Sequence, residues 1–340
     1  PIPVSSALAQ AAEAGSLLLG PISRKVTPRE SGPIVGFGFS GGYDSWFGAS
    51  LLPENSRLIF MRRMVSSSSE SPMDHVRVAN VVRNAAVHGA QPELWDTDLE
   101  ELRRPVGFSV TEDEPDFPFA VLAPMLPFAD GMRLGAVGIG LVLESVYGIG
   151  DSSFRDPAER PYFSLVASLL KTVGLNLFLP MAGLSELVAL KVLARQPTEE
   201  LERRPTACLR GNGQERCWAC FKCLRKEVLF QALLGHPVSE AIYSRVWGSR
   251  EVGVQLSRDP IHHGISLEYQ RRKFPRTQLD EIAPKLARYE KLVESLGHWY
   301  QPSERYIPDQ FRAGYSALLD ANGIRPMSAD EENQVETFNP

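Results

Sequence analysis

The chain has 340 residues, of which 43% are hydrophobic and 23% are charged, a composition typical of one large globular domain or two moderate ones. Its net charge of −5 and pI near 5.8 give no global electrostatic reason to bind nucleic acid, so such a partner is not indicated, although local basic pairs leave it possible. The first residues lack the basic start and apolar core of a signal peptide, and no stretch reaches the roughly 18 uninterrupted apolar residues of a membrane span. We therefore expect a soluble, cytoplasmic protein.

Expected strands and helices alternate along the first two thirds of the chain. Short apolar runs predict strands at 34–39, 57–61, 93–95, 136–140 and 177–179. Apolar periodicity and cap residues predict helices at 7–19, 44–52, 74–88, 162–173 and 185–194. Because this alternation is typical of a parallel sheet covered on both faces, the predicted fold class is α/β, with an open, mostly parallel five-stranded sheet.

The remaining segments are expected to be loop, helix or tail. Residues 105–130 are rich in Pro, Phe and acidic side chains and favour a loop. Residues 224–234 and 278–296 have helical patterns, so the C-terminal part is expected to be mainly α-helical. The acidic tail at 329–340 is predicted to be mobile.

A Gly-rich turn follows the first predicted strand. The run Ser40-Gly41-Gly42-Tyr43-Asp44-Ser45 places backbone N–H groups, a helix N-terminus and two hydroxyls around one point. Such a nest favours a phosphate anion through hydrogen bonds and the helix dipole, and glycines allow a close backbone approach. Asp44 is suited to capping the helix, positioning the loop or holding Mg²⁺.

Two other interpretations of this turn remain open. Residues 36–41 formally match the dinucleotide fingerprint G-x-G-x-x-G, but the strand before the first glycine would be very short. That fingerprint also expects an acidic residue after the second strand, where this chain has Arg62-Arg63, which would suit NADP. The remaining alternative is a Gly-rich turn without a ligand.

The cysteines are confined to one short segment. They are Cys208, Cys217, Cys220 and Cys223, in the pattern C-x8-C-x2-C-x2-C. Four thiolates on a short knuckle suit a closed tetrahedral Zn²⁺ site with a structural role. An iron–sulfur cluster is the main competitor, because two-residue spacings also occur there, and four unliganded thiols are the remaining alternative.

The run Ser40 to Ser45 after a strand resembles the signature loop of the N-type ATP pyrophosphatase (PP-loop) superfamily. The resemblance implies an adenine nucleotide alpha hydrolase-like fold and a loop that holds the pyrophosphate of ATP with Mg²⁺. A substrate oxygen would attack the α-phosphate, and AMP and pyrophosphate would be released. It further implies catalytic roles for Asp44 and Ser45, and nucleotide contacts from the strand ends and the loop, at Phe39, Ser40, Gly41, Gly42, Tyr43, Asp44, Ser45, Met61 and Gly138.

The cysteine pattern resembles the zinc site of one family in that superfamily, 7-cyano-7-deazaguanine synthase, and the run 180–185 resembles the family's closing strand and helix start. The resemblance covers about residues 34–230. This chain departs from the family at Glu186, where a lysine is usual, and at Trp46, where a small hydroxyl residue is usual. The family's Pro-x-Arg-Asn segment has no clear match.

The resemblance divides the chain into an N-terminal helix and connector (1–30), a PP-loop ATP-binding domain (31–200), a zinc knuckle (201–235) and a helical extension (236–340).

We expect an ATP-dependent ligase that adenylates a small carboxylate or oxo compound and forms an amide, nitrile or amidine. With all cysteines bound to metal, no thiol remains to release ammonia from glutamine, so ammonia or an amine must come from outside. The alternatives are a sulfur-inserting nucleoside or tRNA modification enzyme and a nucleotide-binding protein that has lost turnover. The extension is expected to close over the site or to form a homodimer surface.

Overall fold

The computed structural model describes residues 29–63, 74–97, 121–150, 152–196, 208, 216–275 and 277–340. Its centre is a five-stranded sheet in the order β3-β2-β1-β4-β5, in which every neighbouring pair is parallel. The strands are β1 (Ile34–Gly38), β2 (Arg57–Arg63), β3 (Glu93–Thr97), β4 (Leu134–Ile139) and β5 (Asn176–Phe178). The predicted α/β class and the parallel sheet are confirmed.

Helices follow the strands along the first part of the chain. They are α2 (Tyr43–Ser50), α3 (Asp74–Ala86), α6 (Leu143–Tyr147), α7 (Pro161–Thr172) and α8 (Glu186–Leu193). The helix predicted at 7–19 lies outside the described residues. The loop expected at 105–130 is wrong at its described end, where Ala123–Phe128 forms a 3₁₀ helix. Met125 and Leu126 are buried against the sheet in that helix, and their burial orders a segment whose prolines favoured a loop.

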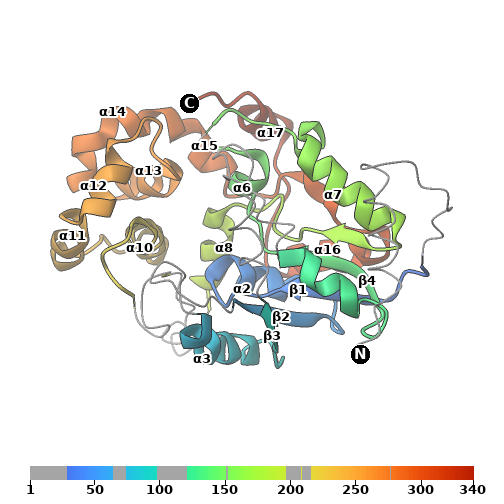
Figure 1. Cartoon of the computed structure of the whole chain (residues 1–340). Coiled ribbons are helices and arrows are strands. Elements are labelled where there is room, and N and C mark those ends of the chain that lie inside the picture. Colours follow the sequence, from blue (N-terminus) through green and yellow to red (C-terminus); the bar gives the residue numbers. More distant parts are fainter. Residues whose placement is uncertain are drawn as a thin grey trace.

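Apolar side chains cover both faces of the sheet, as a parallel sheet requires. On one face, Ile59 and Val137 belong to a core with Val166 and Leu170 of α7. On the other face, the side chains of β1 and β2 pack against helices α2, α3 and α8. Figure 1 shows the sheet between these helices. The strand ends are therefore held between two packed layers.

The C-terminal part of the chain is helical, as predicted. Its α-helices are α10 (Phe221–Leu234), α11 (Glu240–Trp247), α12 (Arg250–Ser257), α13 (Gly264–Lys273), α14 (Ala283–Leu286), α15 (Glu290–Ser295), α16 (Asp309–Ala321) and α17 (Ala329–Glu336). The single helix expected at 278–296 is instead four short pieces, two of them 3₁₀, and Pro284 near the start of α14 removes a backbone donor there. Within the described residues, no helix has the length and apolar character needed to cross a bilayer.

The acidic tail is ordered, so the prediction that 329–340 is mobile was wrong. Ser328 and Glu331 form a capping box that starts α17. Val335 is fully buried, and the ring of Phe338 stacks on Tyr289 with a centroid distance of 5.9 Å. Two apolar anchors thus hold a segment whose composition indicated a solvated tail.

Candidate functional site

The Gly-rich turn joins β1 to α2 at the point where the strand order reverses. β1 is the central strand and pairs with β2 on one side and β4 on the other. Open α/β sheets bind ligands at this switch point, outside the carboxyl ends of the strands. The structure therefore places the turn at the position where such a sheet most commonly carries a site.

Helix α3 packs against the Gly-rich turn and hydrogen-bonds to it. Gly41 has a φ of 70°, and a Cβ there would lie 3.1 Å from Cα of Val81 in α3. The buried amide of Asn84 donates a hydrogen bond of 2.7 Å to the carbonyl oxygen of Gly41. Only glycine fits this conformation and this close approach. Asn84 was missed by the sequence reasoning, because its only signal is a polar position on an otherwise apolar helix face.

The N-cap residue of α2, Gly42, has no side chain to cap the helix. Among the residues that the structure describes, no side chain accepts a hydrogen bond from the first turn of α2. Ser45 Oγ instead donates to the carbonyl oxygen of Gly42 at 3.1 Å and lies 3.0 Å from Ser40 Oγ. The first-turn N–H groups therefore remain for an anion, with Ser40 exposed beside them.

The other residues that were predicted to contact the nucleotide are not all at the turn. The side chains of Phe39 and Tyr43 are buried, and Met61 packs against the core from the end of β2. At Gly138, a Cβ would lie 2.1 Å from the carbonyl oxygen of Phe178, so this glycine is required by the approach of β5. Of these positions, the structure brings Phe39 and Tyr43 to the turn itself.

Gly140, just after β4, contacts the turn more closely than Gly138 does. A Cβ at Gly140 would lie 2.8 Å from the carbonyl oxygen of Asp44 and 3.0 Å from Cα of Ser45. The sequence signal for it is the Gly-Ile-Gly run at the end of a predicted strand. The glycine lets β4 press against the first turn of α2.

A buried charge network connects the turn to α10. Lys226 Nζ lies 2.8 Å from Asp44 Oδ1 and 3.4 Å from Glu186 Oε2, and its side chain is 2% exposed. Arg225 forms a second ion pair with Glu186. Glu186 thus lies between two cations from α10. The sequence reasoning missed Lys226 and Arg225, because no local pattern links α10 to a turn far away in the chain.

Burial favours the neutral form of a second carboxyl group in this network. Glu144 of α6 accepts hydrogen bonds from the backbone N–H of Glu186 at 3.1 and 3.2 Å. Burial, followed by repulsion from Glu186, raises the pKa of Glu144 to about 8. Burial also opposes the charge on Lys226, but the carboxylates of Asp44 and Glu186 outweigh it and raise the Lys226 pKa. The network therefore combines charged pairs with one carboxyl group that its surroundings disfavour in the charged form.

Trp46 faces the core. It stands after the turn, where the resemblance implied a small hydroxyl residue. Trp46 is 6% exposed and its ring lies 5.1 Å from that of His88 at the end of α3. Burial lowers the pKa of His88. Trp46 therefore stabilises the contact between α2 and α3 and does not fill the anion nest.

The four cysteines come together at the start of α10. Their sulfur atoms all lie within 4.8 Å of one another, and Cys217 Sγ is 3.9 Å from Cys223 Sγ. A Zn–S distance of about 2.3 Å in a tetrahedron places sulfurs about 3.8 Å apart, so the group fits a single tetrahedral ion. Backbone N–H groups of Cys217 and Ala219 point at cysteine sulfurs and would stabilise thiolates.

The cysteine group and the charge network share one helix. Cys220 caps α10 and Cys223 lies in its first turn, two positions before Arg225 and three before Lys226. In Figure 1, α10 lies between the sheet and helices α11, α12 and α13. A metal ion at the cysteines would therefore fix the helix that delivers both cations to Glu186 and Asp44.

Comparison with known proteins finds distant likenesses among solved structures. The curated proteins contain no match. Among solved structures, a U34-tRNA thiolase NcsA from Methanococcus maripaludis with its 4Fe-4S cluster is 18% identical, with a TM-score of 0.32, over 71% of this chain and 77% of that one. An NAD+ synthetase from Burkholderia pseudomallei is 17% identical, with a TM-score of 0.22, over 72% of this chain and 89% of that one. Neither likeness is close enough to carry a functional argument.

A family model matches the C-terminal half of the chain. The match runs over residues 165–339 and so includes α8, the cysteine segment and all the helices that follow. It therefore contains Glu186, Arg225, Lys226 and the four cysteines, whereas the Gly-rich turn precedes it. Since the match covers more than half of the residues, the chain belongs to the family of unknown function DUF6395.

Proposed function

We propose that this chain binds ATP with Mg²⁺ at Ser40–Ser45 and transfers its AMP group to a small carboxylate or oxo acceptor. The observation that carries the proposal is the N-terminus of α2 after Gly41-Gly42, which no described side chain caps, at the switch point of a β3-β2-β1-β4-β5 sheet. The run Ser-Gly-Gly-Tyr-Asp-Ser at that point resembles the PP-loop signature.

In the proposed reaction, an acceptor oxygen forms a bond to the α-phosphorus of ATP. The bond from that phosphorus to the bridging oxygen breaks, and pyrophosphate leaves with the electron pair. With an adenylated carboxylate, ammonia or an amine then attacks the activated carbon and releases AMP, giving an amide. With an adenylated amide oxygen, attack by ammonia releases AMP and gives an amidine, whereas loss of AMP and of the remaining N–H proton gives a nitrile. The N–H groups of α2 and the hydroxyls of Ser40 and Ser45 would bind the β- and γ-phosphates, and Asp44 would hold Mg²⁺.

Lys226 supplies the cation that a pyrophosphate leaving group needs. Glu186 alone would repel phosphate, but Arg225 and Lys226 pair with it in the described structure. This compensation favours an active enzyme over a nucleotide-binding protein that has lost turnover. The arrangement requires Lys226 to exchange part of its contact with Asp44 for phosphate once Mg²⁺ binds that carboxylate.

The test is acid-dependent exchange of labelled pyrophosphate into ATP, measured over a panel of small carboxylic acids and oxo compounds. The proposal predicts exchange with at least one acceptor, and loss of that exchange in Asp44→Asn. The exposed Asp320→Asn on α16 is the matched control and should exchange like the unchanged protein. Exchange that persists in Asp44→Asn would remove Asp44 from the site.

Sulfur insertion is the second candidate from the sequence, and it requires an iron–sulfur cluster or a free thiol. The sulfur separations at the four cysteines suit one tetrahedral ion, whereas the irons of a cubane cluster hold their cysteines farther apart. The geometry therefore favours zinc and nitrogen transfer. Iron in at least twofold excess over zinc, in protein purified without oxygen, would favour sulfur insertion instead.

A further inference from the structure

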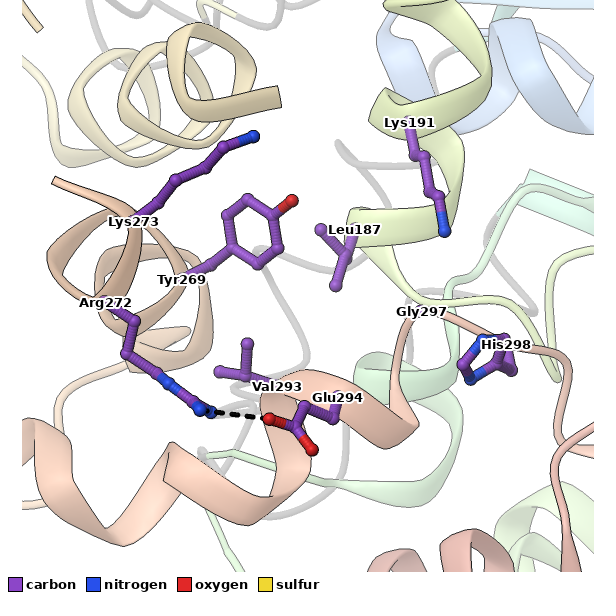
Figure 2. Close-up of a pocket in the computed structure, with 9 residues that line it drawn as sticks. All are labelled: Leu187, Lys191, Tyr269, Arg272, Lys273, Val293, Glu294, Gly297 and His298. Carbon is purple, nitrogen blue, oxygen red and sulfur yellow. Dashed lines mark hydrogen bonds and ion pairs between the residues drawn. The ribbon is translucent and has the colours of Figure 1, made fainter. Parts of the chain in front are cut away.

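A pocket of about 380 Å³ lies between α8, α13 and α15, on a different face of α8 from Glu186. Figure 2 shows Lys191 on one wall, Tyr269 and Lys273 on the opposite wall, and Val293 on the α15 side. The volume lies in the range of small-molecule sites, about 300–1,000 Å³.

Lys191 does not belong to the charge network around Glu186. The two residues are five positions apart in α8, so their side chains leave the helix about 140° apart. Lys191 points into the pocket with Arg272 and Lys273, whereas Glu186 contacts α10. A change at Lys191 therefore tests the pocket without altering the contacts of the phosphate loop.

The pocket has an excess of positive charge in a chain whose net charge is −5. Arg272 Nη2 is paired with Glu294 at 3.0 Å, and His298 Nδ1 lies 2.9 Å from Glu331. Neither Lys191 nor Lys273 has a carboxylate partner among the residues that the structure describes, although Lys273 lies over the ring of Tyr269 at 5.9 Å. Two ammonium groups thus remain to bind an anion.

The surroundings of Lys191 also favour an anion. Burial lowers its pKa, and the nearby guanidinium groups of Arg195 and Arg325 lower it further. A positive field that disfavours the Lys191 charge stabilises a negative ligand at the same point. The ammonium group lies 4.0 Å from where a Cβ would be at Gly297, so the glycine keeps that side open.

The remaining wall is apolar. Leu187 and Val293 are buried side chains that line the pocket, and the partly buried ring of Tyr269 completes it. An inorganic ion would leave this surface uncovered, whereas an aromatic or other apolar body would cover it and gain burial. The lining therefore matches a ligand with one apolar part and at least one anionic group.

We propose that this pocket binds a small organic anion, a carboxylate or phosphate ester on an aromatic or apolar body. Lys191 and Lys273 bind the anionic group, and Tyr269, Leu187 and Val293 contact the body. The proposal does not depend on the ATP chemistry of the phosphate loop.

The test is calorimetric titration with phenyl phosphate, benzoate and inorganic phosphate as probes. At least one aromatic probe should bind saturably and more tightly than inorganic phosphate, and the stronger of the two identifies the anionic group. Lys191→Met should weaken that binding about tenfold or more, the loss of one charge-assisted hydrogen bond. Lys171→Met, on the exposed side of α7, is the matched control and should change nothing.

A second variant should change the affinity for the probe in the opposite direction. Glu294→Gln releases Arg272 from its ion pair and adds an uncompensated cation to the pocket, so it should strengthen binding severalfold. Glu294 is exposed, and the variant should keep its fold. The proposal is overturned by the absence of saturable binding, by equal binding of inorganic phosphate, or by an affinity that Lys191→Met and Glu294→Gln leave unchanged.

Discussion

Lys226 Nζ lies 2.8 Å from Asp44 Oδ1, although the two residues are 182 positions apart in the chain. The contact joins the helix that starts at the cysteines to the first turn of α2. Lys226 is almost fully buried, so its charge is tolerated only because Asp44 and Glu186 neutralise it. The cysteine group and the Gly-rich turn are therefore connected through one buried charge network.

Replacing Lys226 should affect both stability and chemistry. Lys226→Met removes the ion pair of Asp44 and one of the two ion pairs of Glu186, so the free energy of unfolding should fall by about 3 kcal/mol. AMP formation should slow by about 100-fold or more, because a cation beside the leaving group is lost. Denaturant unfolding and nucleotide assays measure the two effects, with Lys171→Met as the control.

A double-mutant cycle separates the ion pair from a general packing effect. Combining Lys226→Met with Glu186→Gln removes the carboxylate charge that the lysine neutralises. The double variant should be more stable than the sum of the single changes predicts, by about 1–3 kcal/mol. Additive losses would mean that Lys226 and Glu186 do not stabilise each other.

Gly140→Ala should damage the loop more than the fold. The new methyl group would lie 2.8 Å from the carbonyl oxygen of Asp44 and 3.0 Å from Cα of Ser45. Both distances are too short, so the first turn of α2 must shift. We expect ATP binding to weaken about tenfold or more and stability to fall by about 1–3 kcal/mol. Gly253→Ala in α12, where a Cβ meets nothing within 4 Å, should leave both unchanged or slightly raise stability. Unaltered ATP affinity in Gly140→Ala would show that β4 does not position the loop.

The stability of the protein should depend on pH through Glu144. Its pKa is about 8 in the folded state, against an ordinary value of 4.5, so the folded protein holds a proton that the unfolded chain releases between those values. The contribution of this proton to the free energy of unfolding is complete below pH 4.5 and is lost as the pH rises through 8. Glu144→Gln keeps an acceptor for the Glu186 N–H without titrating, so near pH 9 it should be more stable than the unchanged protein by about 1–3 kcal/mol.

Urea unfolding across this pH range checks the prediction. The difference between Glu144→Gln and the unchanged protein should grow with pH, whereas Glu30→Gln, at an exposed position, should give a parallel curve. A parallel curve for Glu144→Gln as well would show that Glu144 has an ordinary pKa.

Removing one cysteine should release the metal and loosen α10. Cys220→Ala loses both a ligand and the side-chain cap of that helix, whereas Ala219→Ser, at the exposed neighbouring position, keeps all four sulfurs. Elemental analysis should find about one zinc ion per chain in the unchanged protein and in Ala219→Ser, and little in Cys220→Ala. A folded, metal-replete Cys220→Ala would exclude Cys220 as a ligand.

The sheet was predictable because its signals are local. A short apolar run marks each strand, and the Gly41-Gly42 turn follows the first of them. The cysteine group was predictable for the same reason, since its spacing already restricts which sulfurs can meet. The tail was mispredicted because charge dominates its composition, whereas Val335 and Phe338 decide its packing.

The charge network could not be predicted from local patterns. Arg225 and Lys226 lie in a helix that also carries Lys222 and Glu227, and only the fold shows that they face Glu186 and Asp44. Burial also determines the protonation of Glu144, which a sequence does not reveal. The buried carboxylate of Glu186 is explained only by the cations that α10 places beside it.

The most direct measurement is the identity of the nucleotide product. With ATP, Mg²⁺, an amine source and an acceptor identified by pyrophosphate exchange, chromatography and phosphorus NMR separate the possible products. Attack at the α-phosphate at Ser40–Ser45 predicts AMP and pyrophosphate in equal amounts, both lost in Asp44→Asn. ADP and inorganic phosphate as the products would contradict the account.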